Sequence, residues 1–263
     1  MPVLDSLLSP VSYTAVNSYL FICQCIYLKC GRITMRDYEL YYWGLPFRGN
    51  FIQLFLEDVR ADYQKLDAGE VSPDKNLDFQ YPGMAPPYLY DCRARVWLAQ
   101  MPAILMHLAR AYDYLPDEPE EQTLALKVIL DCDDVLMEIT NHNGMMMWEQ
   151  ESWNDFRSHR LANWMAIFEK TGQAHSLKPD SGYLLGSRLT VADIATAALF
   201  GTLTHSFPEL ARDLKDNAPG VANLCQRMEA RPSIRSFLDT QRKELGNAYC
   251  GGQIERSLRD VVR

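Results

Sequence analysis

The stretch DYELYYWGLPFRGNFIQLFLEDV, residues 37–59, decides the fold. Its aromatic-rich beginning, residues 37–43, is typical of a buried strand. A Gly-Leu-Pro-Phe turn follows at residues 44–47. The apolar residues that come next recur at helical spacing, which predicts a helix over residues 51–59 that begins near Arg48. A strand that leads through a short turn into a helix indicates an α/β domain.

The sequence continues this α/β pattern as far as residue 112. The next elements are expected to be a strand, a polar surface loop with room for one short helix, a hairpin and a helix, at residues 61–66, 67–83, 88–91 with 94–98, and 103–110. Pro102 suits the start of that last helix because the first helical position needs no N–H. The predicted order is therefore β-α-β, loop, β-β-α.

The second half of the chain is helical in pattern. An acidic segment with two prolines, residues 113–119, separates it from the first half and is the predicted linker. Helices are expected at residues 120–141, 151–170, 191–205, 208–216, 221–231 and 233–246. The predicted domains are thus an α/β domain over 37–112 and an all-α domain over 120–246, followed by a C-terminal tail over 247–263.

Composition excludes some classes of function. The chain has 263 residues and a formal net charge of −8. A nucleic-acid partner is not expected, because phosphate backbones are bound by dense Lys/Arg surfaces. The cysteines are odd in number and scattered, with no CxxC pair: Cys23, Cys25, Cys30, Cys92, Cys132, Cys225 and Cys250. Reduced thiols in a cytoplasmic protein are the simplest interpretation.

Residues 1–36 differ from the rest of the chain. Their most apolar part, residues 12–28, is interrupted by Asn17, Ser18 and Gln24 and is short for a bilayer span. We expect an N-terminal extension that is disordered or loosely docked, without stable membrane insertion. An anchor or targeting role and a true start at Met35 are the alternatives.

Several motifs in order carry a family resemblance. The segment YWGLPFRG at residues 42–49 is similar to the first strand and turn of the tyrosine-type soluble glutathione transferases. APPYL at 85–89 is similar to their cis-proline segment, and QMPAIL at 100–105 to their Gln-Ser-x-Ala-Ile-Leu. LTVADI at 189–194 resembles the helix-capping box of their second domain, and RPSI at 231–234 the start of a late helix.

The resemblance implies a thioredoxin-like N-terminal domain, an all-α C-terminal domain and glutathione as co-substrate. It also implies a homodimer. The expected activity is transfer of glutathione to an apolar electrophilic small molecule, in detoxification or secondary metabolism. Two alternatives remain, namely a glutathione-dependent cis/trans double-bond isomerase and a non-catalytic binding or interaction module of the same fold.

Tyr42 is the predicted catalytic residue. The thiolate is the nucleophile, and a glutathione thiol with a pKa near about 8.5 is mostly protonated at pH 7. Lowering that pKa by ~2 units requires ~2.7 kcal/mol, which a phenolic hydrogen bond and a helix N-terminus can supply. Tyr41 is the competing residue, because it points to the opposite face of the strand. With no cysteine at the first turn, redox chemistry is a weaker hypothesis.

The expected glutathione-binding residues are Arg48, Pro86, Pro87, Gln100 and Met101. Pro87 corresponds to the family's cis-proline. Gln100 and Met101 would lie at a helix N-terminus, where backbone N–H groups can bind a carboxylate. Two residues depart from the family pattern. Met101 replaces a hydroxyl residue, and Pro86 has no N–H to offer.

The pocket for the second substrate is expected between the turn at residues 44–47 and the end of the first long helix of the second domain. Its predicted lining is Leu45, Phe47, Met137, Asn141 and Trp148. The histidines show no metal-ligand spacing, so no metal site is predicted.

Overall fold

The computed structural model describes residues 36–71, 79 and 81–263. The predicted N-terminal extension, residues 1–36, therefore lies outside the described residues except for Arg36. Most of the segment 72–80 within the predicted surface loop lies outside them too. Within the described residues, no helix has the length and the apolar character that a membrane span requires.

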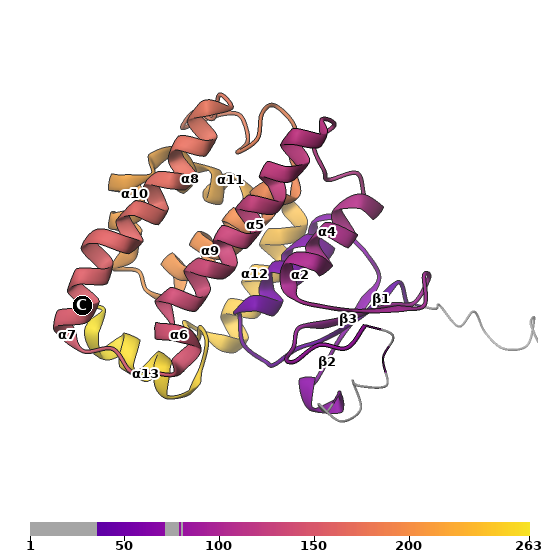
Figure 1. Cartoon of the computed structure of the whole chain (residues 1–263), viewed down its shortest axis with the longest axis horizontal. Coiled ribbons are helices and arrows are strands. Elements are labelled where there is room, and N and C mark those ends of the chain that lie inside the picture. Colours follow the sequence, from indigo (N-terminus) through magenta and orange to yellow (C-terminus); the bar gives the residue numbers. More distant parts are fainter. Residues whose placement is uncertain (1–35, 72–78, 80) are drawn as a thin grey trace, which may run out of the picture. The chain divides into compact units, whose positions relative to one another are not determined.

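The first part of the fold is a mixed sheet with helices on one face (Figure 1). Its strands are β1 (Tyr38–Tyr41), β2 (Tyr63–Leu66), β3 (Tyr88–Asp91) and β4 (Val96–Ala99), in the order β2-β1-β3-β4. β1 pairs parallel with β2 and antiparallel with β3, and β3 pairs antiparallel with β4. The predicted order of elements is confirmed.

The helices of this part pack on the even-numbered side of β1. α2 (Arg48–Asp58) and α4 (Met101–Ala111) share the main core with Tyr38, Leu40 and Tyr42. Tyr41 points to the other face, where it joins a small aromatic cluster with Trp97. This alternation is expected because successive side chains of a strand point to opposite faces of the sheet.

The second part is helical and is built around α9 (Val191–Ser206), which is buried along nearly its whole length. The helices around it are α5 (Pro119–Ile139), α8 (Ala162–Ala174), α10 (Leu210–Asn217), α11 (Pro219–Glu229) and α12 (Pro232–Leu245). α9 begins with the predicted capping box: the side chain of Thr190 accepts from the N3 backbone, and Asp193 Oδ2 accepts from the Thr190 backbone N–H at 2.8 Å.

Two features of the helical part were not predicted. The helix expected over 151–170 consists of α7 (Gln150–Asp155), a π-helical turn, η2 (Phe156–Leu161), and α8. The buried residues Trp153, Phe156, Leu161 and Met165 explain the π turn, because a step of five residues from Phe156 to Leu161 exceeds the α-helical repeat.

The second feature is α13 (Gly252–Val261), which forms where a tail was expected. One side of this helix is buried, at Glu255, Ser257, Leu258 and Val261. The chain also reverses after α5 through a short segment, α6 (Asn141–Gly144), in which Asn141, His142 and Asn143 adopt left-handed conformations. α13 packs near this reversal (Figure 1).

A buried ion pair joins the end of α2 to the helical part. The Asp58 carboxylate is only 1% exposed and accepts from the Arg231 guanidinium at 2.5 and 3.1 Å, just before α12. It also accepts the Tyr114 hydroxyl at 2.7 Å, from the segment between α4 and α5. The division into domains at residues 113–119 stays a prediction, but this contact ties the two parts together.

Candidate functional site

A pocket of about 510 Å³ lies where several segments that are distant in sequence meet. The turn between β1 and α2, the segment before β3, and the start of α4 contribute to it from the first part of the fold. α5, α6 and the C-terminal segment contribute from the helical part. This is a typical size for a small-molecule site.

Tyr42 lines this pocket directly after β1, and its side chain is only 2% exposed. Burial raises the pKa of its phenol to about 12, while the Arg48 guanidinium and the amides of Gly49 and Arg48 act in the opposite direction. At neutral pH the phenol is therefore protonated and can donate a hydrogen bond. The Tyr41 hydroxyl instead donates to Glu39 Oε2 at 2.8 Å, away from the pocket.

The first turn of α2 lies directly against the Tyr42 ring. A Cβ atom at Gly49 would lie 2.3 Å from Cδ1 of Tyr42, so only glycine permits this approach. Phe47, the residue before α2, makes no side-chain cap to this helix. The amides of Arg48 and Gly49 instead interact with the Tyr42 phenol oxygen, and the Asn50 amide donates to the Phe47 carbonyl at 2.9 Å. The N-terminus of α2 therefore brings the positive end of the helix dipole to the phenol.

The other predicted glutathione-binding residues also line the pocket. The peptide bond between Pro86 and Pro87 is cis, as the resemblance implies. Gln100 precedes α4 with φ 70° and ψ 116°, a conformation that is rare for a residue other than glycine. Met101, the first residue of α4, is 1% exposed. Such backbone outliers are concentrated at functional sites, which makes Gln100 notable.

Arg48 crosses the pocket from α2 to the helical part. Its Nε donates to Asp133 Oδ1 at 2.8 Å, its Nη2 donates to Asn143 Oδ1 at 3.0 Å, and its guanidinium lies over the Phe47 ring. Asp133 and Asn143 also line the pocket, although neither is among the residues predicted from the sequence. Their pairing with Arg48 is non-local, so nothing in the sequence spacing could have indicated it.

The predicted second-substrate residues divide into two groups. Leu45 and Phe47 line the pocket as expected. Met137, Asn141 and Trp148 do not belong to the lining that the described residues form. Met137 is on an exposed side of α5, the Asn141 amide donates to the Met147 carbonyl, and the Trp148 indole donates to the Ile139 carbonyl at 2.8 Å within an aromatic cluster.

In their place, the C-terminal segment provides Cys250 and Ile254. Neither residue was predicted, because residues 247–263 were expected to form a tail. Burial and the nearby Glu255 raise the pKa of the Cys250 thiol to about 12, so this thiol is protonated at neutral pH. A weak signal for α13 was present in the sequence, since Ile254, Leu258 and Val261 recur at helical spacing.

The structure resembles solved glutathione S-transferases. The Pi-class glutathione S-transferase of Onchocerca volvulus is 22% identical, with 82% of this chain and 98% of that chain covered and a TM-score of 0.66. NaGST-2 is 20% identical, with 78% and 97% covered and a TM-score of 0.63. These two structures establish the shared fold.

Sequence comparison leads to the same family. No curated protein matches the chain significantly. The model of the glutathione S-transferase C-terminal domain matches residues 124–261, more than half of the chain. The chain therefore belongs to the glutathione S-transferase family.

Proposed function

We propose that this protein is a glutathione transferase that holds glutathione as a thiolate beside Tyr42 and transfers it to an apolar electrophile. The observation that carries the proposal is the meeting of three elements in one pocket: Tyr42, the N-terminus of α2 beside its phenol, and the start of α4. The homodimer stays a prediction from the family resemblance, and the cytoplasmic location stays a prediction from the scattered cysteines.

The proposed role of Tyr42 follows from its protonation state and its neighbours. Its phenol oxygen faces the amides of Gly49 and Arg48, which lower its pKa. Those amides interact with the oxygen, which leaves the O–H proton free to point toward a ligand. A charge-assisted hydrogen bond from this O–H to a sulfur anion, together with the α2 dipole, favours the thiolate over the thiol.

The rest of glutathione would lie between the cis-proline segment and α4. The amides at the start of α4, at Gln100 and Met101, suit the γ-glutamyl carboxylate. Pro86 can offer only its carbonyl to the cysteinyl backbone, because proline has no N–H. Met101 offers no hydroxyl. We therefore expect this site to bind glutathione more weakly than a site that offers an N–H at position 86 and a hydroxyl at position 101.

The second substrate would occupy the more apolar side of the pocket. Leu45, Phe47 and Ile254 line this side, and Trp43 and Met84 also line the pocket while being 50% and 89% exposed. A flexible methionine and an exposed aromatic ring suit contact with apolar molecules of varied shape. This supports an apolar electrophile as the acceptor.

The test is a titration of the thiolate absorbance of bound glutathione in the wild type and in Tyr42→Phe. We expect the bound thiol to titrate ~2 pH units below free glutathione in the wild type, and close to free glutathione in the variant. Tyr41→Phe is the matched control, because its hydroxyl is bonded to Glu39 on the other face of the sheet.

An unchanged thiol pKa in Tyr42→Phe would refute the role of the phenol. Failure of the wild type to be retained on glutathione-agarose would favour the non-catalytic alternative, which the residues at positions 86 and 101 keep open. A product with the mass of the co-substrate, in place of a conjugate, would identify the isomerase.

A further inference from the structure

Glu255 is a buried carboxylate in the first turn of α13, and it is not among the described residues that line the pocket. Its Oε2 accepts the amide of Tyr249 at 3.0 Å and the amide of Gly251 at 2.6 Å. These two residues flank Cys250, which does line the pocket. One carboxylate oxygen thus fixes the backbone on both sides of a pocket residue.

Arg259 completes this arrangement. Its guanidinium donates to Glu255 Oε1 at 3.0 and 2.6 Å, to the Asn247 carbonyl at 2.5 Å, and to the Ser206 carbonyl at the end of α9 at 3.4 Å. The same guanidinium lies over the Phe207 ring. Burial opposes ionisation, but Arg259 and the two amides hold the pKa of Glu255 below its usual value. The carboxylate is therefore charged at neutral pH.

The turn that Glu255 holds lies against the opposite wall of the pocket. Gly251 has φ 72°, and a Cβ atom there would lie 2.5 Å from Cδ1 of Leu45. The backbone of the C-terminal segment therefore meets the β1–α2 turn at close range. Because Leu45, Cys250 and Ile254 all line the pocket, a displacement of this backbone changes the space available to a ligand.

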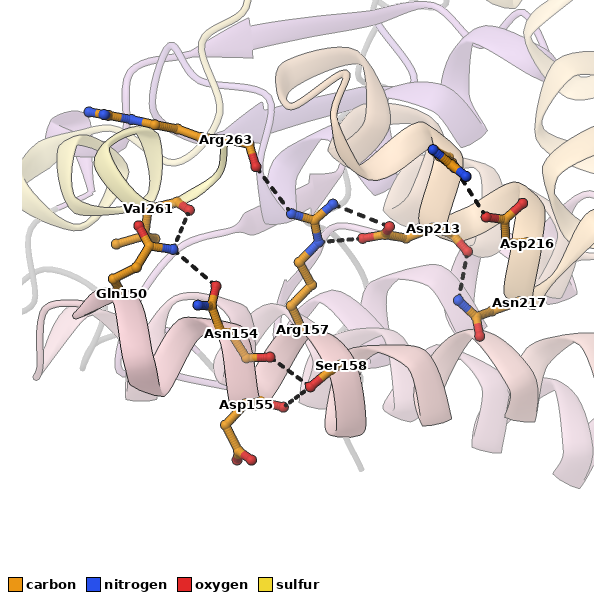
Figure 2. A network of polar contacts seen from close by, with 11 residues as sticks. Gln150, Asn154, Asp155, Arg157, Ser158, Asp213, Asp216, Asn217, Val261 and Arg263 are labelled. Atoms are coloured by element: carbon orange, nitrogen blue, oxygen red, sulfur yellow. Dashed lines mark hydrogen bonds and ion pairs between the residues drawn. The ribbon is translucent and has the colours of Figure 1, made fainter.

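The far end of α13 is fixed by separate contacts, which Figure 2 shows. The Gln150 amide donates to the Val261 carbonyl at 3.1 Å, and Arg157 donates to the Arg263 carbonyl at 3.4 Å. Arg157 is itself held by Asp213 on α10, at 2.6 and 3.2 Å (Figure 2). Loss of the carboxylate should therefore release residues 249–251 while the helix stays anchored.

We propose that Glu255 is a positioning residue: it holds the amides of Tyr249 and Gly251 and so sets the wall of the pocket formed by Cys250 and Ile254. The part of this inference that concerns the second substrate rests on the proposed function. The part that concerns the position of Cys250 does not.

The first test measures alkylation of individual cysteines by N-ethylmaleimide, followed by peptide mass spectrometry. In Glu255→Gln we expect Cys250 to react about tenfold faster, because a charged acceptor of two amides is lost. Cys132 and Cys225 are buried in the core and report global unfolding, so their rates should not change. Unchanged Cys250 alkylation, or an equal increase at all three, would overturn the proposal.

Arg259→Gln separates positioning from a direct effect of charge. The Glu255 carboxylate raises the pKa of Cys250 and the Arg259 guanidinium lowers it. A purely electrostatic effect would therefore slow alkylation in Arg259→Gln, whereas loosening of the turn speeds it up in both variants. We expect faster alkylation in both, and a slower rate in Arg259→Gln would overturn the proposal.

Gln150→Ala is the matched control, because it removes a contact of α13 at the far end and leaves the carboxylate in place. Cys250 alkylation in this variant should stay within about twofold of the wild type. An increase as large as in Glu255→Gln would show that any loosening of α13 moves the wall, which contradicts a specific role for Glu255.

The second test is kinetic and uses an aryl halide as the electrophile. We expect Glu255→Gln to raise the KM for the aryl halide several-fold and to leave the KM for glutathione unchanged. Equal changes in the two KM values would contradict the proposal that Glu255 positions the pocket wall formed by Cys250 and Ile254. Absence of turnover in the wild type would count against the proposed function, while the alkylation rates would still decide the position of Cys250.

Discussion

Gly49→Ala offers a sharp test of how α2 supports Tyr42. The new Cβ would lie 2.3 Å from Cδ1 and 2.4 Å from Cγ of the Tyr42 ring. Non-bonded carbon atoms prefer about 3.5 Å or more, so the ring has to withdraw by about 1 Å. The ring is buried, so it can withdraw only by displacing the side chains packed around it or by moving into the pocket.

The expected size of the effect differs between stability and activity. Overpacking of a core costs about 1–3 kcal/mol. Alanine in place of glycine inside a helix offsets this cost by up to about 1 kcal/mol, because alanine has the higher helix propensity. The net loss of stability is therefore about 0–3 kcal/mol. A shift of about 1 Å in a catalytic group, in contrast, lowers kcat/KM by about a hundredfold.

The assay combines urea unfolding with kcat/KM and the titration of bound glutathione. Gly44→Ala is the control from the same turn, because its Cβ would have no neighbour within 4 Å. We expect a large loss of activity only in Gly49→Ala, together with a thiol pKa closer to that of free glutathione. Wild-type kcat/KM and thiol pKa in Gly49→Ala would refute the reasoning.

Three further predictions concern stability. Asp58→Ala should lower the free energy of unfolding by about 3 kcal/mol in urea, because it leaves the Arg231 guanidinium without its carboxylate; a loss below about 1 kcal/mol would contradict this. Burial raises the pKa of Asp193 to about 6. The Asp193 carboxylate therefore binds a proton more tightly in the folded chain than in the unfolded chain. Stability should therefore fall as pH rises from about 4 to about 6, and Asp193→Asn should flatten that slope; an equal slope in the variant would exclude Asp193 as its source. Gly251→Ala should lower the Tm more than Gly252→Ala, since both have positive φ but only the first meets the β1–α2 turn; equal shifts would show that the contact is unimportant.

Local patterns in the sequence were sufficient to predict much of the fold. The stretch at residues 37–59 predicted β1, its turn and α2 because strand and helix periodicities are local. Thr190 and Asp193 marked the start of α9, since a capping box is contained within four residues. Pro87 was correctly expected to follow a cis peptide bond, although that expectation came from family resemblance.

Features that depend on contacts between distant segments could not be predicted in the same way. Asp133 was not predicted as a site residue, yet it pairs with Arg48 across the pocket. The π turn at residues 156–161 arises from core packing, which the helical pattern alone does not reveal. Trp148 was assigned to the pocket, but the chain reversal through left-handed residues at 141–143 directs it into an aromatic cluster.

The C-terminal segment shows the same limit. Gly251 and Gly252 separate α13 from the helices before it, and glycines normally indicate the end of regular structure. The Glu255–Arg259 pair is local, but the helix is also stabilised by the bond from the Gly251 amide to Glu255 and by contacts with α6 and α7, which helical periodicity does not reveal. For this reason Cys250 and Ile254, which form one wall of the pocket, were not predicted from the sequence.

Calorimetry of glutathione binding in buffers of different ionisation enthalpy tests the central claim most directly, because it counts the protons released on binding. If the pocket lowers the thiol pKa by ~2 units from about 8.5, binding at pH 7 should release about 0.7 proton per glutathione. The Tyr42→Phe variant should release far fewer protons per glutathione bound than the wild type. Tight binding without proton release, or no binding at all, would contradict an account in which Tyr42 and α2 hold the sulfur as an anion.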